Sequence, residues 1–228
     1  MSRIITISRQ FGSGGRTIGK LVAEKLGVRC YDKELIEKTA EETGYANEYI
    51  EQEAEYAPGT GFFAYSFLGR GTDGLANADR IWIAQRKVIT DIASKENCVI
   101  VGRCADYILK DEPDCFNVFV WAPDDFRAHR IVEQYGASPV RPLKRLEEKD
   151  KKRKLNYRYF TGREWGEGEL PSLHRQLQGW YRARSRFDYN GCRERLIITS
   201  KNRQFARNDL LTIPLPCGIF KCIKALFK

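Results

Sequence analysis

At 228 residues, of which 42% are hydrophobic and 12% aromatic, the chain suits one folded domain with a sizeable core, and this composition excludes a disordered protein. No segment approaches the ~18 apolar residues of a membrane span, and the N-terminus lacks the apolar core of a signal peptide, so we expect a cytoplasmic protein without membrane association. The net charge of +9 lies after residue 126, on an otherwise acidic body, which favours a basic cover over a polyphosphate and disfavours a nucleic-acid surface.

The first 27 residues predict a strand, a glycine-rich turn and a helix. Residues 4–8 form a short β-branched, apolar run that is typical of a buried strand. Apolar residues recur at helical spacing over residues 17–26, and Gly27 suits the C-terminal cap of that helix. A strand, a glycine turn and a helix in this order open a parallel α/β sheet.

The turn at residues 8–17 predicts a phosphate-binding loop. Its glycines allow several backbone N–H groups to converge on one anion, and the N-terminus of the following helix favours negative charge. A tight connection between strand and helix without a ligand is the alternative interpretation. The residues that we expect to contact the bound phosphates are Gly12, Ser13, Gly14, Gly15, Arg16 and Thr17.

The next segment combines a helix with a region that has two interpretations. Asp32 suits the N-cap of a helix that continues to Thr43, and Gly44 suits its end. A short acidic helix follows near residues 48–56, and then a stretch rich in glycine and aromatic residues. Residues 45–78 are either a surface excursion that packs its aromatic rings on the core or an insert that binds a substrate.

The following elements alternate between helices and apolar strands. We expect helices at residues 79–93, 123–134 and 140–154, and buried strands at Cys98–Val101 and Cys115–Trp121. This order predicts a three-layer α/β fold, in which a parallel sheet lies between two layers of helices. The seven cysteines include no CxxC pair and no histidine at metal spacing, so we expect free thiols and no zinc site.

Several separated motifs resemble those of bacterial cytidylate kinases and of the branch called cytidylate kinase-like. Residues 4–26 align with the family's opening without gaps, and the strand that ends in CVIVGR resembles the family segment that ends in Asp-Gly-Arg-Asp. YDKELI at residues 31–36, RAHR at residues 127–130 and the stretch at residues 157–166 complete the resemblance. It covers about residues 3–166, which we take as one kinase domain of residues 1–166.

The resemblance implies a fold and an activity. The fold is of the P-loop NTPase type, with an acceptor-binding insert at about residues 33–78 and a lid at about residues 127–165. The activity is the transfer of the ATP γ-phosphoryl group to a nucleoside monophosphate, with CMP or dCMP as the first candidates and Mg²⁺ as the cofactor. Two other functions stay open: a kinase for another small-molecule acceptor, and a nucleotide-binding module without catalysis.

The resemblance also implies roles for individual residues. Asp32 and Arg103 would hold the acceptor, and Thr17 would help to bind Mg²⁺. Residues 127–166 carry 12 Lys and Arg against 5 Asp and Glu, which suits a lid that stabilises charge during phosphoryl transfer, although a solvated helix face explains these charges too. The residues implied to act on the transferred group are Arg16, Arg127, Arg130, Arg153 and Arg158.

The chain departs from the family pattern at two places. Arg9 stands at the first glycine of the phosphate-loop motif and Gly15 at its lysine, so the cation on the transferred phosphate must come from another residue. The candidates for this cation are Arg16, Arg9 and Lys20. Val101 and Cys104 stand where acidic residues are usual. The acidic residues that could compensate are Asp106 and Asp32.

Residues 167–228 do not continue the resemblance. The family continues with a strand and a C-terminal helix that complete the sheet, whereas this tail is basic and poorly patterned for either element. Codons can be chosen for residues 169–196 so that a frame shifted by one base spells Asn-Tyr-His-Leu-Cys-Ile-Asp-Ser. The same frame then gives a helix rich in Val, Ile and Ala and ends at a stop. We therefore hypothesise that this tail is a frameshifted form of the family ending.

Overall fold

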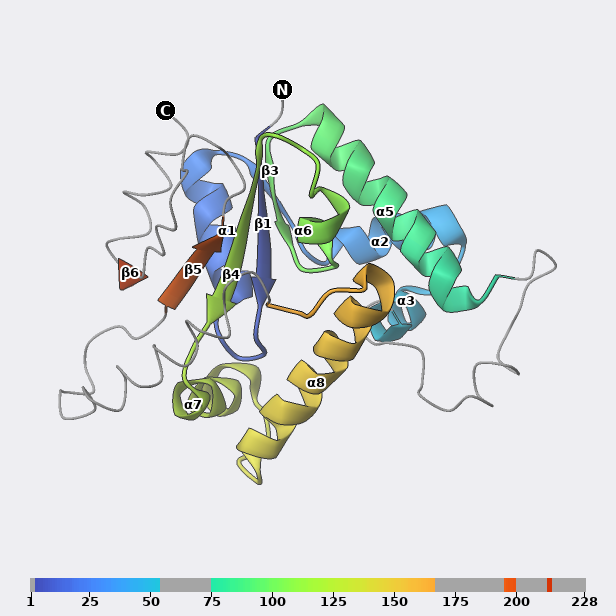
Figure 1. Ribbon diagram of the computed structural model, residues 1–228. Coiled ribbons are helices and arrows are strands. Elements are labelled where there is room, and N and C mark those ends of the chain that lie inside the picture. The colour runs from blue at the N-terminus through green and yellow to red at the C-terminus, as the bar shows by residue number, and fades with distance from the viewer. Residues whose placement is uncertain (1–2, 54–74, 167–194, 200–212, 215–228) are drawn as a thin grey trace.

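The computed structural model describes residues 3–53, 75–166, 195–199 and 213–214. Figure 1 shows a central sheet with helices on both sides and with α7 and α8 at one end. The helices and strands follow in this order: β1 (Ile4–Arg9), α1 (Gly15–Leu26), β2 (Arg29–Tyr31), α2 (Glu34–Thr43), α3 (Asn47–Glu53), α5 (Asn77–Lys95), β3 (Cys98–Val101), α6 (Ala105–Ile108), β4 (Cys115–Trp121), α7 (Asp124–Tyr135), α8 (Pro142–Thr161), β5 (Arg195–Thr199) and β6 (Ile213–Pro214).

The body of the sheet has the strand order β2-β3-β1-β4, and all neighbours in it are parallel. The central strand β1 pairs with β3 on one side and with β4 on the other. Because parallel strands end at the same edge, the turns after β1 and β3 lie side by side. The N–H of Gly102 after β3 donates to the carbonyl of Ile7 in β1 at 2.9 Å, which fixes these two turns against each other.

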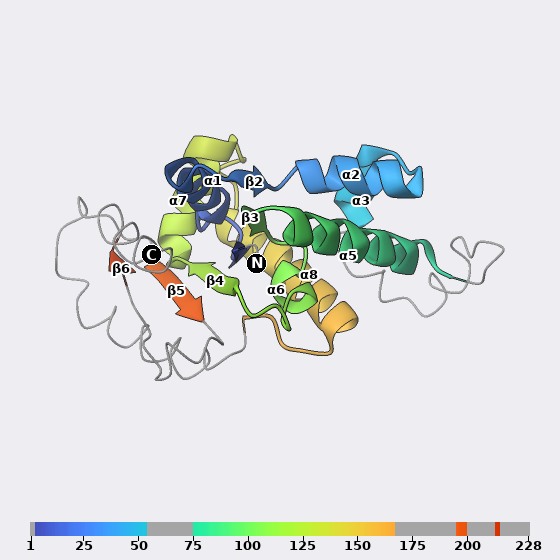
Figure 2. The ribbon, with the colours of Figure 1, turned by 90° about the horizontal axis from the view of Figure 1, so that it is seen from above.

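Alternate residues of β1 face opposite layers of helices. Ile5 and Ile7 pack with apolar residues of α1, whereas Ile4 packs with apolar residues of α5 and α6. Figure 2, a view from above, shows α1 on one side of the sheet and α5 and α6 on the other. These contacts confirm the predicted three-layer α/β fold with a parallel sheet. In the ranges that the structure describes, no helix is both long and apolar enough to cross a membrane.

Most predicted elements are present with shifted ends. β3 and β4 have the predicted bounds, while α1, α5 and α8 are longer than predicted. Gly27 caps α1 with φ of 67°, as predicted. The sequence did not predict β2 or α6, which are too short, at 3 and 4 residues, to show a period. The predicted N-cap role of Asp32 is wrong: the N-cap of α2 is Lys33, and no side chain makes the capping bond.

The described C-terminal residues contain two strands that the sequence analysis did not expect. β5 pairs with β4 in the antiparallel direction, and β6 pairs with β5 at the edge of the sheet. Residues 54–74 of the predicted insert lie outside the described residues, as do residues 167–194, 200–212 and 215–228 of the tail.

The described cysteines are free thiols, as predicted, namely Cys30, Cys98, Cys104 and Cys115. Burial raises the pKa of the Cys98 thiol to about 12, and that of the Cys30 thiol to about 11. These thiols therefore stay protonated at neutral pH and act as small apolar residues of the core.

Gly19 allows α1 to approach the sheet closely. A Cβ atom at this position would lie 2.8 Å from Cγ2 of Val101 in β3 and 3.3 Å from Cδ1 of Ile7 in β1. Carbon atoms do not approach so closely without displacement of one of them. The glycine therefore sets the distance between α1 and the sheet, and with it the place of the helix N-terminus.

We expect Gly19→Ala to lower the free energy of unfolding by about 1–2 kcal/mol. Overpacking against Val101 costs about 1–3 kcal/mol, and the higher helix propensity of alanine returns only up to about 1 kcal/mol. Urea denaturation measures the change. Lys20→Ala, at the exposed neighbouring position, is the control and should stay within about 0.5 kcal/mol of the parent. A more stable Gly19→Ala protein would contradict the close contact.

Candidate functional site

The turn between β1 and α1 forms a tight loop at the N-terminus of α1. Gly12 and Gly14 have φ of 78° and 88°, a region that favours glycine, and Gly14 is the N-cap of α1. Ser13 is buried, and its hydroxyl donates to the carbonyl of Gln10 at 2.9 Å. A Cβ atom on Gly12 would lie 2.9 Å from Cγ2 of Ile131 in α7. The loop is therefore confined between α1 and α7, with the N-terminus of α1 facing it.

A cavity of about 530 Å³ lies beside this loop, at the carboxyl ends of β1 and β3. This volume is within the range of small-molecule sites, ~300–1,000 Å³. Five basic and three acidic side chains line the cavity, so its charge favours an anion. The predicted site residues that it brings together are Gly12, Gly14, Gly15, Arg16, Asp32, Arg103 and Arg153.

Arg103 lies in a strained turn after β3. It has φ of 57° and Cys104 has φ of 53°, in the left-handed region, which costs about 1–3 kcal/mol for a non-glycine residue. Gln85 donates from Nε2 to the Arg103 carbonyl at 3.1 Å. Arg103 is only 8% exposed, and its buried Nη1 has no hydrogen-bond partner among the described residues. A buried N–H group of a cation without a hydrogen-bond partner is suited to an anionic ligand.

Arg16 and Asp32 bind each other at the edge of the cavity. Arg16 Nε lies 2.5 Å from Asp32 Oδ2, and Nη2 lies 3.5 Å from Oδ1. The side chain of Asp32 is 9% exposed and that of Arg16 is 49% exposed. The cation predicted on the donor side and the acid predicted on the acceptor side therefore form one salt bridge.

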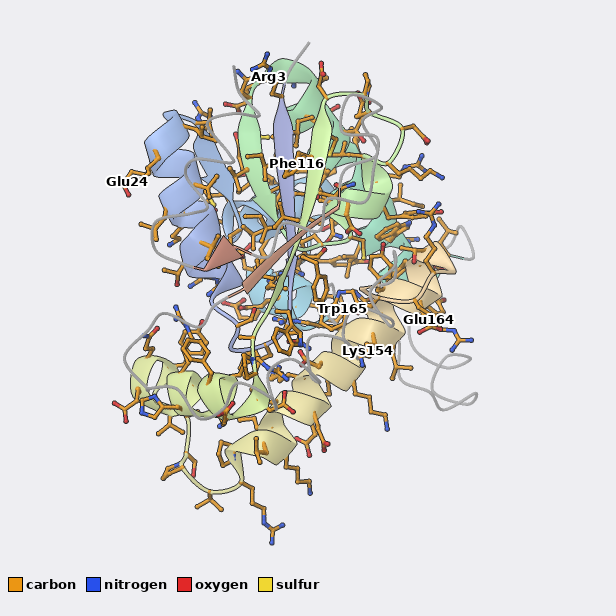
Figure 3. The ribbon with its side chains drawn as sticks, turned by 60° about the vertical axis from the view of Figure 1, so that its left-hand side comes forward. Arg3, Glu24, Phe116, Lys154, Glu164 and Trp165 are labelled. Carbon is orange, nitrogen blue, oxygen red and sulfur yellow. The ribbon has the colours of Figure 1, made fainter. Side chains whose placement is uncertain are left out.

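Two of the predicted lid arginines lie in different surroundings on α8. Arg153 lines the cavity, places its guanidinium 5.6 Å from the ring centre of Phe11, and donates from Nη1 to the Arg9 carbonyl at 3.3 Å. Arg158 is largely exposed and pairs with Glu164 at 3.2 Å, away from the cavity lining. Figure 3 labels Trp165, the residue after Glu164, near the place where α8 meets the sheet. Of the two arginines, only Arg153 reaches the cavity.

Thr17, the predicted magnesium ligand, is bound to a third lid arginine. Arg130 Nη2 donates to the Thr17 hydroxyl oxygen at 3.1 Å. A guanidinium at this distance repels a second cation on the same oxygen, so Thr17 in this arrangement does not fit as a metal ligand. Across the ranges that the structure describes, no group of three or more His, Cys, Asp and Glu side chains is arranged to hold a metal ion.

Arg127 lies beneath the loop and outside the cavity lining. Its side chain is 5% exposed, and Nη1 donates to Asp150 Oδ2 at 2.6 Å and to the Phe11 carbonyl at 2.9 Å. Nη2 donates to Asp124 at 2.6 Å. Asp150 also accepts the Phe11 N–H at 2.8 Å. Arg127 from α7 and Asp150 from α8 thus hold both polar groups of Phe11, which makes Arg127 a positioning residue.

Asp106, which the sequence analysis considered as a substitute acid, lies behind the site. Its carboxylate accepts hydrogen bonds from Tyr157 at 2.7 Å and from Ser8 at 3.3 Å. Burial raises the pKa of Asp106. The carboxylate lines neither the large cavity nor the small one beside it, so it serves the packing of α6 against β1 and α8.

The sequence analysis did not single out several residues of the site. Asp150 and Lys149 lie in a heavily charged helix, where no period distinguishes the face that meets the loop. Glu48 and Glu51 reach the cavity from the short helix α3. Their contribution depends on where α3 and α8 lie relative to the glycine loop, which neighbouring residues in the sequence do not encode.

We expect Arg127→Ala to lower the free energy of unfolding by about 3–5 kcal/mol. The substitution leaves the Asp150 carboxylate buried without its cation, which is the costly way to break a buried ion pair. Thermal or urea denaturation measures the loss. Lys144→Ala removes a partner from the exposed Lys144–Glu148 pair in α8 and should cost no more than about 1 kcal/mol. Equal losses in the two variants would contradict the anchoring role.

Comparison with known proteins identifies one family. The sequence model of the cytidylate kinase-like family matches residues 4–171. A cytidylate kinase of Archaeoglobus fulgidus is 30% identical over 154 residues, which are 66% of this chain and 73% of the relative. A cytidylate kinase of Pyrococcus horikoshii is 25% identical over 160 residues, which are 70% and 71% of the two chains.

A solved structure gives the same fold. An uncharacterized protein from Eubacterium ventriosum matches with a TM-score of 0.54 and 24% identity, over 81% of this chain and 100% of its own. The residues that match the family model contain the glycine loop, the turn with Arg103 and the two helices that anchor Phe11. The chain belongs to the cytidylate kinase-like family.

Proposed function

We propose that the protein transfers the γ-phosphoryl group of ATP to a nucleoside monophosphate, with CMP or dCMP as the first candidates. Membership of the family indicates nucleotide-dependent phosphoryl transfer in general. One observation carries the finer proposal: the glycine loop lines the same cavity as Arg103, whose buried Nη1 has no hydrogen-bond partner among the described residues. An anion-binding loop for the donor therefore adjoins a cation for the acceptor phosphate.

The donor phosphates would bind at the N-terminus of α1. The backbone N–H groups of residues 12–17 and the positive end of the helix both favour phosphate oxygens. Mg²⁺ accompanies the nucleotide in this class of reaction and neutralises charge on the phosphates. We assign it no protein ligand, because the Thr17 hydroxyl binds Arg130.

The acceptor would bind between Arg103 and the Arg16–Asp32 pair. Arg103 would hold the acceptor phosphate, because its Nη1 is buried and its backbone is held by Gln85. Asp32 is mostly buried at the cavity wall and would accept hydrogen bonds from the base, in exchange for part of its contact with Arg16. The charged lid would then stabilise the developing negative charge, with Arg153 in the cavity lining, Arg130 on the Thr17 hydroxyl and Arg158 further out.

Formation of ADP with a panel of nucleoside monophosphates tests the proposal. We expect turnover with CMP or dCMP and at most weak turnover with AMP, GMP and UMP. Turnover with a different acceptor would favour another kinase specificity. ATP binding without turnover of any acceptor would refute the proposal and favour a nucleotide-binding module, which the glycine at the lysine position of the loop also suits.

We expect Arg103→Met to raise the acceptor KM by about 10–100-fold, because a hydrogen bond to a charged group contributes about 1.5–3 kcal/mol. The KM for ATP should change by less than about threefold, since the backbone loop holds the donor. Arg29→Met, which removes an exposed arginine of β2, is the matched control. A rise in the ATP KM equal to that of the acceptor KM would contradict the assignment of Arg103 to the acceptor.

We also propose that residues 167–196 are read in a shifted frame. The family match ends at residue 171, close to the predicted shift, and β5 pairs antiparallel to a sheet body that is otherwise parallel. Sequencing of the gene from independent isolates tests this proposal, and an intact frame in all of them would refute it. A chain carrying the shifted-frame ending should unfold at a higher urea concentration than the present one.

A further inference from the structure

The proposed reaction needs a cation at the phosphate loop, and the residue at the usual lysine position is Gly15. Arg16, the next residue, has its guanidinium on Asp32, with Nε 2.5 Å from the carboxylate. Lys20 is exposed on α1 and is not part of the cavity lining. Neither of these two candidates therefore directs its charge to the loop.

The side chain of Arg9 fills the space that a side chain at position 15 would need. A Cβ atom on Gly15 would lie 2.5 Å from Cβ of Arg9 and 2.9 Å from its Cγ. Both distances are far below van der Waals contact, and the atoms concerned belong to the stem of Arg9, which has little freedom to move. A lysine at position 15 and an arginine at position 9 therefore exclude each other. The arginine at position 9 and the glycine at position 15 are therefore linked departures from the usual motif. The side chain with the positive charge stands at position 9, and position 15 is left without a side chain.

The other end of the Arg9 side chain lies over the turn that carries Arg103. A Cβ atom on Gly102 would lie 1.7 Å from Nη1 of Arg9 and 2.7 Å from its Cζ. Gly102 is itself fixed by its hydrogen bond to Ile7. The arginine thus extends from the last residue of β1, past the loop, to the end of β3. Two glycines, one in each turn, leave room for it.

Three arginines line this place together. Arg9, Arg103 and Arg153 all line the cavity of about 530 Å³ and also the adjoining small cavity of about 30 Å³. The backbone of Arg9 is held by its pairing with β4 and by Arg153, which donates to its carbonyl. The positive charges of these three side chains add in the cavity, and a polyphosphate is attracted by all of them.

We propose that Arg9 supplies the cation of the phosphate loop in place of the lysine and lies between the donor and the acceptor phosphates. This inference rests on the proposed function. A guanidinium presents two parallel N–H groups, so Arg9 can bind oxygens of both phosphates, which the single ammonium of a lysine does less well. Arg9 stays protonated throughout. The phosphoryl group leaves the bridging oxygen of ADP and bonds to an oxygen of the acceptor phosphate, and Arg9 stabilises the charge on the group in transit.

An exchange of the two positions tests this proposal. Arg9→Gly removes the cation, and Gly15→Lys introduces a clash with the Arg9 stem. Each single variant should lower kcat by about 10²–10³-fold, the usual effect of losing one transition-state stabiliser. The double variant Arg9→Gly with Gly15→Lys restores the usual motif and should recover at least about tenfold over either single variant. A recovery of less than twofold would overturn the proposal.

A second pair of variants provides the control. Gly15→Lys combined with Arg16→Gly keeps the clash with Arg9, so it should remain as impaired as Gly15→Lys alone. Recovery in this pair would assign the cation to Arg16 and overturn the proposal. Arg9→Lys keeps the charge without the planar fork, and it should lie between the parent and Arg9→Gly in kcat.

Binding of a non-hydrolysable ATP analogue, measured by calorimetry, separates this inference from the proposed function. Loss of affinity in Arg9→Gly and Gly15→Lys, with recovery in the double variant, supports the role of Arg9 even if no acceptor is turned over. Full turnover and unchanged analogue affinity in Arg9→Gly would overturn the inference and leave the proposed function intact. Urea denaturation of the parent, Arg9→Gly, Gly15→Lys and the double variant gives a third readout. Because the side chains at positions 9 and 15 compete for the same space, the double variant should regain the free energy of unfolding that Gly15→Lys loses.

Discussion

A buried ion pair between Arg127 and Asp150 fixes the place where the glycine loop meets the helices α7 and α8. Such a pair stabilises a protein little by itself, since both charges lose their hydration. Here each partner also binds one polar group of Phe11, so the pair satisfies the backbone of the loop as well. The loop, α7 and α8 are thereby joined at one residue. The conformation of the loop and the position of these two helices are for this reason not independent of each other.

The cavity beside the loop combines strain with concentrated positive charge. Arg103 has a left-handed backbone and an Nη1 without a partner among the described residues, and it adjoins Arg9 and Arg153. Each of these features lowers the stability of the protein without a ligand. Stability is commonly lost at sites that are preorganised for a ligand of opposite charge. The buried strands and the close contact at Gly19 supply the rigid support for this site.

The sequence predicts those parts of the structure that have a clear period or a defined turn chemistry. The strand Cys98–Val101 and the cap at Gly27 are as predicted, because a buried parallel strand is continuously apolar and a helix end favours glycine. Asp32 was misassigned because a capping position and a salt bridge with Arg16 demand the same residue type. The buried place of Arg127 could not be predicted, since it depends on the angle between α7 and α8.

The mutual exclusion of side chains at positions 9 and 15 also restricts how such a loop can evolve. Two amino-acid substitutions, Arg9→Gly and Gly15→Lys, convert this loop to one with a lysine at position 15, and they can occur in either order. If Gly15→Lys comes first, the intermediate carries both side chains, which clash. If Arg9→Gly comes first, the intermediate has glycine at both positions and lacks the cation. Either intermediate is impaired, so loops of the two kinds are separated by a fitness barrier. A lineage that has acquired Arg9 therefore tends to keep Gly15 and Gly102 with it.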